Sequence, residues 1–154
     1  MTYSITYQVD LFNGAADLTD SESFIRDALY LLLSRDITFL KSHPNAPMLY
    51  RTGLRYREEP RGEENWRDIP TCLREGDRGN PDCEDLSCWR AAEVNVRYGI
   101  LAVPIFSHRT LANGDVVYHI RVQYPNGHIE DPSRVLGMGQ TSAPRYPLLG
   151  RLGK

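Results

Sequence analysis

The chain has no long hydrophobic run and no strong excess of one charge. None of its apolar stretches approaches the roughly 20 residues that a membrane-spanning helix needs. The start, MTYSITYQVD, lacks the basic and apolar regions of a secretory signal. The formal net charge is −2, which gives no electrostatic reason to bind nucleic acid or an anionic membrane. We therefore expect a cytoplasmic protein with neither of these partners.

Cysteine is scarce and odd in number. The three residues are Cys72, Cys83 and Cys88. In a chain without a signal, an odd count favours a reducing compartment and free thiols over a disulfide framework. Cys83 and Cys88 have C-x4-C spacing, and no second Cys or His pair completes a zinc set. We expect no metal and no cofactor.

Repeats and low-complexity segments are also absent. Apolar residues make up 41% of the 154 and charged residues 25%, values that are ordinary for a soluble globular protein with one core. Glycine and proline are frequent at the end of the chain. We predict a single domain over residues 1–138 and an extended tail over 139–154.

The first part of the chain predicts one strand and two helices. Residues 2–11 alternate between apolar and polar side chains, which is typical of a half-buried strand. Thr19 and Glu22 have the spacing of a capping box at the start of a helix over residues 20–34. A second, short helix is expected to end before Pro44.

Residues 43–81 are rich in charge, proline and glycine and show no strong periodicity. A loop of this length is often functional, and it could build a specificity pocket together with the tail. The alternative is a connector wrapped over the core. Within the loop, NWRDIPTCLREG predicts a short helix.

The second half predicts a helix followed by antiparallel strands. An apolar stripe at three- and four-residue spacings indicates a helix from residue 82 that ends at Gly99. Runs of helix followed by runs of strand predict the α+β class. The stripe consists of Leu86, Trp89, Ala92 and Val96, and the strands are expected at residues 100–106, 116–124 and 128–131.

Cys83 has a special position in this helix. Asp82 is a good N-cap and Pro81 suits a helix start, which places Cys83 at the first helical position. The helix dipole favours a thiolate there, and the thiolate is the nucleophile. The alternative is a small buried side chain. We interpret Cys88, which lies in mid-helix, and Cys72 as packing residues.

Two acidic residues follow Cys83. Glu84 and Asp85 fall in the first helical turn, where they interact favourably with the helix dipole. Their negative charge also opposes an extreme lowering of the thiol pKa.

The last hairpin offers a base with an orienting partner. His119 lies within the strand VVYHIRV, where it could also be a core histidine with a satisfied ring nitrogen. The turn YPNGH suits a type I turn with a G1 bulge, which pairs Tyr124 with His128. Asp131 then falls opposite Arg121 and diagonal to His119, about 7 Å away at the backbone. A two-residue turn would instead point Asp131 to the other face.

Three separated motifs, DCEDLSCWRAAE, YHIRV and IEDPSRVLGM, resemble the transglutaminase-like cysteine peptidase superfamily. The chain is most similar to the short transglutaminase-like proteins of tailed bacteriophages, over about residues 58–138. The resemblance implies a papain-like core with the nucleophile at the start of a central helix packed on an antiparallel sheet. It also implies Cys83 as nucleophile, His119 as general base and acid, and Asp131 as orienter.

The chain departs from that family just before the nucleophile. The usual short Gly-Asp-Cys turn reads GDRGNPDC here, which places a small insertion at residues 79–81, beside the expected oxyanion pocket. The backbone N–H of Cys83 is the natural first oxyanion donor. Trp66 is the candidate second donor, because an indole N–H only donates. Asn65 and Asn80 are alternatives, and Trp66 could equally anchor the loop by packing.

These residues predict a thiol-dependent hydrolase that acts on a peptide or protein substrate through a thioester. The same triad could transfer the acyl group to an amine, as a true transglutaminase does. A third hypothesis is a phage structural or host-interaction protein that uses the fold for binding. The resemblance implies a location in the host cytoplasm or on the virion.

Overall fold

The computed structural model describes residues 17–60, 64–114 and 116–139. The strand predicted for residues 2–11 and nearly all of the predicted tail, residues 140–154, lie outside this description.

The described residues form an α+β fold, as the sequence predicts. Its sheet is antiparallel, with the strand order β1-β2-β3. The elements in chain order, with η for a 3-10 helix, are α1 (Asp17–Ser42), η1 (Leu49–Arg51), α2 (Ile69–Glu75), η2 (Gly76–Gly79), α3 (Cys83–Tyr98), β1 (Val103–Thr110), β2 (Val116–Gln123), β3 (Ile129–Glu130) and α4 (Pro132–Val135).

Helix α1 is a single long helix, so the prediction of one helix over residues 20–34 and a second, short one is wrong. The helical period continues through the second segment, because Leu33 and Leu40 are two turns apart and both enter the same core cluster. Thr19 lies inside the described helix, so the capping box that we predicted with Glu22 does not mark its start.

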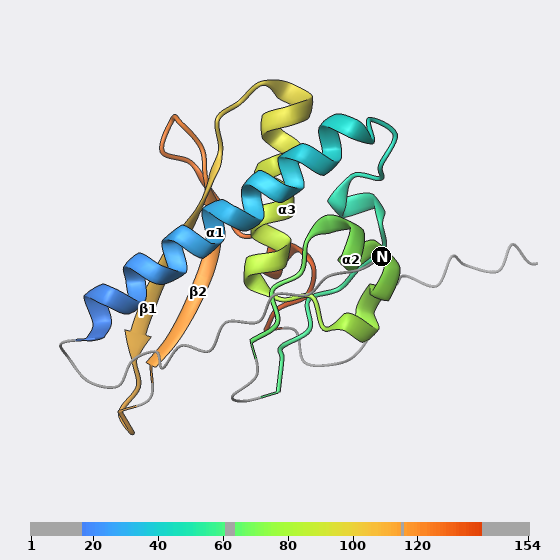
Figure 1. Cartoon of the computed structure of the whole chain (residues 1–154). Helices are drawn as coiled ribbons and strands as arrows, with labels where there is room; N and C mark the ends of the chain where they lie inside the picture. The colour runs from blue at the N-terminus through green and yellow to red at the C-terminus, as the bar shows by residue number, and fades with distance from the viewer. Residues whose placement is uncertain (1–16, 61–63, 115, 140–154) are drawn as a thin grey trace, which may run out of the picture.

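Helix α3 is the central element. Its predicted apolar residues Leu86, Trp89 and Ala92 are fully buried, and most of its other side chains are buried too. It ends as predicted at Gly99, whose φ of 67° suits glycine best. In Figure 1, α1 crosses in front of the sheet and of α3. The contacts agree with this view: α1 packs against α3 and β1, and α3 packs against β2.

Strands β1 and β2 form a long hairpin, and β3 adds a very short third strand. The predicted strand at residues 100–106 begins later, at Val103, and continues to Thr110 with its last residues exposed. Strand β3 has only 2 residues, paired as Val122 with Glu130 and Gln123 with Ile129. The loop before α3 contains the predicted short helix, which is α2.

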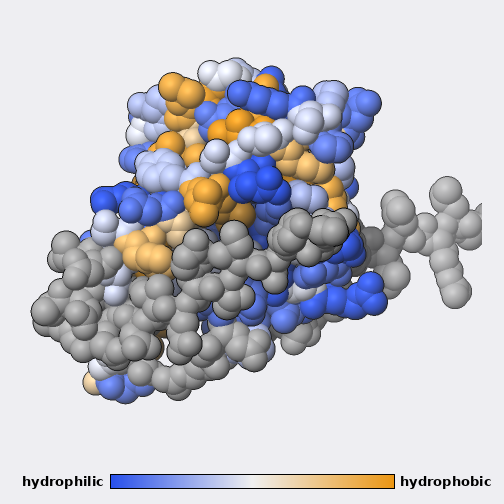
Figure 2. Space-filling view, in the orientation of Figure 1, coloured by the Kyte–Doolittle hydropathy of each residue, from blue (hydrophilic) through white to orange (hydrophobic). Residues whose placement is uncertain are grey.

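None of the described helices is long and apolar enough to cross a membrane. Figure 2 shows hydrophobic and hydrophilic side chains mixed on the face that α1 crosses. The large exposed hydrophobic side chains of α1 are Phe24, Tyr30 and Leu31.

Candidate active site

The start of α3 has the predicted boundaries. Asp82 is the N-cap residue and Cys83 is the first residue of the helix. The Asp82 side chain, however, makes no capping hydrogen bond. Cys83 is only 7% exposed, so its sulfur lies beneath the surface.

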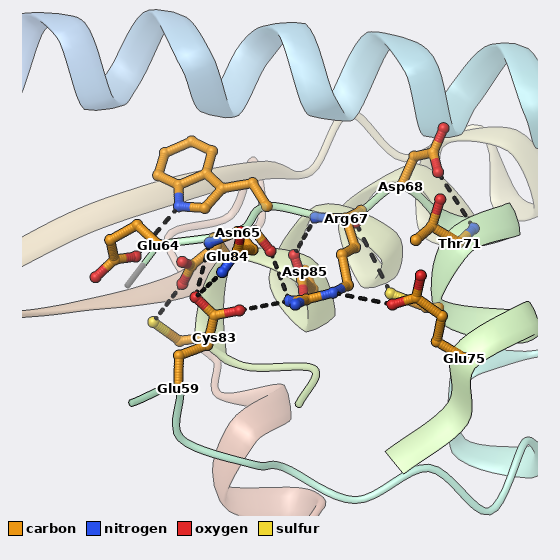
Figure 3. A network of polar contacts seen from close by, with 12 residues as sticks. Glu59, Glu64, Asn65, Arg67, Asp68, Thr71, Glu75, Cys83, Glu84 and Asp85 are labelled. Atoms are coloured by element: carbon orange, nitrogen blue, oxygen red, sulfur yellow. Dashed lines mark hydrogen bonds and ion pairs between the residues drawn. The ribbon is translucent and has the colours of Figure 1, made fainter. Parts of the chain in front are cut away.

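The Cys83 thiol is held by the residue that follows it. Its Sγ donates a hydrogen bond to Oε2 of Glu84 at 3.0 Å, as Figure 3 shows. Within the residues that the structure describes, no hydrogen bond joins Cys83 to His119. In this state the nucleophile candidate is therefore directed to a carboxyl group and not to its expected base.

The thiol pKa is raised well above its ordinary value, and the lowering that we expected from the helix dipole is wrong. Burial is the largest cause. The charge of Glu84 and its hydrogen bond come next, followed by the charge of Asp82. A hydrogen bond from the Ile120 backbone N–H works in the opposite direction but is the weakest of these effects. Cys83 is therefore a neutral thiol at rest.

Glu84 and Asp85 are buried, which corrects their interpretation as acids that only complement the helix dipole. Glu84 is 1% exposed and Asp85 is fully buried. Burial, and then the charge of Asp82, raise the pKa of both carboxyl groups well above the ordinary range. Asp85 accepts a hydrogen bond from the backbone N–H of Arg67 at 2.6 Å. The first turn of α3 thus carries acids that the fold surrounds.

Arg67 ties the long loop to this end of α3. Its Nη1 donates to Glu59 Oε1 at 2.6 Å and lies 3.7 Å from Asp85 Oδ2. Its Nε donates to Glu75 Oε2 at 3.3 Å, at the end of α2. Figure 3 shows this guanidinium among the three carboxyl groups. The predicted loop therefore has a fixed connection to helix α3.

His119 and Asp131 form the predicted pair. The three-residue loop pairs Tyr124 with His128, and the Tyr124 backbone N–H donates to the His128 carbonyl at 2.9 Å. The ring Nε2 of His119 lies 2.9 Å from Asp131 Oδ2. The other oxygen of Asp131 accepts from the Arg134 backbone N–H at 3.2 Å and so caps α4. Two contacts thus fix the orientation of this carboxylate.

The early end of β3 leaves a gap at the edge of β2, and α3 fills it. In this register Ile120 would pair with Pro132, which has no N–H to donate. Instead, the Ile120 carbonyl accepts from Ser87 Oγ at 3.0 Å. Cys83 packs in the same buried cluster as Ile120, the residue that follows His119.

The three oxyanion donor candidates have different surroundings. Trp66 packs against the cluster that contains Cys83, and its Nε1 donates to Glu64 Oε2 at 3.4 Å. Asn65 is bound by Glu59, which accepts from the Asn65 backbone N–H at 2.7 Å. Asn80, within the insertion at residues 79–81, has a left-handed backbone with φ 50°. Of the three, only Trp66 is in this cluster.

The other two cysteines have packing contacts, as their interpretation predicts. Cys88 is fully buried, with its Sγ 3.6 Å from the Leu29 carbonyl of α1. Cys72 is 1% exposed, with its Sγ 3.8 Å from the Arg67 carbonyl. All three cysteines are free thiols.

Carboxylate oxygens of Glu59, Glu64 and Asp82 lie within 4.8 Å of one another, which is close enough to surround a cation. Glu59 already bonds to Arg67, however, and Glu64 accepts a hydrogen bond from the Tyr118 hydroxyl at 2.5 Å. Acidic groups at this spacing are common without an ion, and we assign no metal or cofactor to them.

Sequence reasoning missed Ser87 and the burial of Glu84. Ser87 lies one helical turn after Cys83, so the i, i+4 spacing could have placed both on the face that meets the sheet. No local pattern in the sequence predicts that Glu84 is buried.

Comparison of the chain with protein-family models, with curated proteins and with solved structures finds no match.

Proposed function

We propose that the protein is a thiol-dependent amide or peptide hydrolase with a papain-like, transglutaminase-like core. Cys83 would be the nucleophile, His119 the general base and acid, and Asp131 the orienter. One observation carries the proposal: Cys83 packs in the same buried cluster as Ile120, the residue that follows His119, and the Nε2 of His119 is already bonded to Asp131. This leaves Nδ1, the ring nitrogen nearer the main chain, to accept the thiol proton.

The proposed reaction starts from a neutral thiol. Rotation about the Cys83 side chain moves the sulfur from Glu84 toward His119. As Sγ attacks the carbonyl carbon, Nδ1 of His119 accepts the thiol proton and then gives it to the leaving amine. The thioester that remains is attacked by water, which loses a proton to His119. Release of the carboxylic acid returns the proton to Cys83.

The oxyanion of each tetrahedral intermediate needs donors. The Cys83 backbone N–H is at the start of α3, where helical N–H groups have no intrahelical partner. Trp66 remains our candidate for the second donor. It would have to exchange its hydrogen bond to Glu64 for one to the oxyanion.

Covalent trapping tests this function. We would incubate the protein with a mixture of peptide amides, quench with acid and search for a thioester on Cys83 by mass spectrometry. We expect an adduct on Cys83 in the wild type and in Cys88→Ala, a matched control because Cys88 is a buried thiol of the same helix. Cys83→Ala should form none. His119→Ala should lower kcat/KM about 10²- to 10⁴-fold.

The same experiment separates the competing functions. With a primary amine present, an amide product in place of the acid would identify acyl transfer. If neither an adduct nor a product forms, and Cys83→Ala behaves as the wild type does, the enzymatic proposal is wrong and a binding role for the fold takes its place.

A further inference from the structure

Glu130 of β3 gathers three side chains from other parts of the chain. The hydroxyl groups of Tyr50 and Tyr124 both donate to it. Arg90 Nε lies 3.0 and 3.2 Å from its two carboxylate oxygens. The Arg90 guanidinium also stacks over the Tyr50 ring, 5.1 Å from its centroid. Burial alone would raise the pKa of Glu130, but its three partners lower it. We call these four residues the Glu130 cluster.

The cluster compensates for the shortness of β3. This strand has only 2 residues, and such a short pairing is weak without side-chain contacts. The residue directly after Glu130 is Asp131, the partner of His119. Whatever holds Glu130 therefore also holds the backbone from which Asp131 projects.

Through Arg90, the Glu130 cluster reaches α3 on the face of the helix that also carries Cys83. Arg90 follows Cys83 by seven residues, which places it nearly above Cys83, about 10 Å further along α3. Ser87 lies between them and donates to the Ile120 carbonyl. One face of α3 thus meets the sheet through Ser87 and Arg90, and Cys83 on the same face packs in the cluster of Ile120.

We propose that Arg90 and Glu130 are positioning residues that fasten β3 to α3 and so hold Asp131 against His119. This inference rests on the proposed function, because it assigns a role within the same triad. Without the ion pair, β3 would shift along the edge of β2 and carry Asp131 with it. A displacement of about 1 Å at a reacting group can cost about 10²-fold in rate. We expect the loss in kcat, with KM nearly unchanged, because neither residue touches the reacting atoms.

Glu93 provides a matched control. It is a buried carboxyl group of α3 that also contacts Arg90, at 3.7 Å, and it accepts from the Leu49 backbone N–H at 3.2 Å. It has no hydrogen bond or ion pair with β3 in the described part of the chain. Glu93→Gln therefore perturbs the same helix and the same arginine without releasing Asp131.

The test uses an NMR signal that a change in stability alone would not shift. In ¹⁵N-labelled protein, the hydrogen-bonded Nε2–H of His119 is observed as a downfield imidazole resonance and assigned by its loss in His119→Ala. We expect Arg90→Ala and Glu130→Ala to shift this signal by more than one part per million or to remove it, with kcat reduced about 10²-fold. Arg90→Lys should restore part of the imidazole signal and part of kcat. Glu93→Gln should change neither.

An unchanged imidazole signal in folded Arg90→Ala and Glu130→Ala would overturn the inference. If either alanine variant does not fold, Arg90→Lys and Glu130→Gln are judged by the same criterion. The NMR readout needs no substrate, so its result is separate from that of covalent trapping. A responsive signal without any thioester on Cys83 would contradict the proposed function alone.

Discussion

At the scale of single residues, the nucleophile candidate is restrained by its own neighbour. The Cys83 thiol donates to Glu84, whose carboxyl group is buried beside it. A thiolate at this position would face the negative charges of Glu84 and Asp82. The resting thiol is therefore neutral, and in the proposed reaction His119 would remove its proton during the attack.

Glu84→Gln should make Cys83 more reactive. Glutamine keeps an acceptor oxygen but cannot acquire the charge that Glu84 carries once the pH exceeds its raised pKa, and that charge raises the pKa of the thiol. A decrease of one unit in the thiol pKa would give about tenfold faster alkylation at a pH at which the Glu84 carboxyl group of the wild type is ionised. The measurement is the iodoacetamide rate at Cys83 against pH, with each cysteine followed by mass spectrometry.

Glu93→Gln is the control for this variant, since it neutralises another buried carboxyl group of α3 that, among the described residues, makes no hydrogen bond to Cys83. Equal alkylation rates in the wild type and in Glu84→Gln at every pH would contradict the expected effect of the Glu84 charge on the thiol pKa.

The sequence predicts the His119–Asp131 contact but not the protonation of Cys83, because the first depends on nearby residues and the second on contacts that are distant in sequence. The His119–Asp131 pair depends on a local turn whose residue types fix the register of the two strands over a few positions. The thiol pKa depends on burial in the folded chain and on the charges of Glu84 and Asp82. A helix start alone predicts the opposite direction for the thiol.

At the scale of elements, the β2–β3 loop determines where Asp131 lies. Gly127 has φ 82°, the left-handed conformation that the three-residue loop needs. Gly127→Ala should destabilise the protein by about 1–2 kcal/mol, because a Cβ is unfavourable there. Gly127→Asn should cost less, since asparagine tolerates this region better. Urea unfolding measures the free energy of unfolding of both variants, and a Gly127→Ala variant more stable than Gly127→Asn would contradict this account of the loop.

The element predictions failed where a helix continued past its expected end. Residues 35–42 contain polar side chains that suggest a break, but Leu40 keeps the spacing of the buried face. Asp36 is fully buried in α1, and its Oδ1 accepts from the Ile69 backbone N–H at 2.8 Å, at the start of α2. That contact crosses 33 positions of sequence and has no local signature.

At the scale of the whole molecule, buried acids link stability to pH. Burial is the first cause that raises the pKa of Asp36 to about 8 and of Asp82 to about 7. The pKa values of Glu84 and Asp85 are also raised. Each group binds its proton more tightly in the folded chain than in the unfolded one. The stability that this supplies is complete below about pH 4 and is lost as the pH rises through the folded-state pKa.

We therefore expect the free energy of unfolding to fall between pH 5 and pH 8. The slope should be about 1.4 kcal/mol per pH unit for each proton that the folded state retains. Asp36→Asn removes one such group and should make the decrease shallower. Urea unfolding at several pH values measures the slope. A free energy of unfolding that rises over this interval would contradict the expected protonation of these buried acids.

The labelling rates of the three buried thiols can also report how often each part of the structure opens. Cys88 lies between α1 and α3, Cys83 packs in the cluster that contains Ile120 of β2, and Cys72 lies in α2. A reagent can reach each sulfur only when the layer above it opens, so three labelling rates measured on one unmodified chain give the opening free energies of three separate interfaces. The scarcity of cysteine makes each of these signals assignable to one place in the fold.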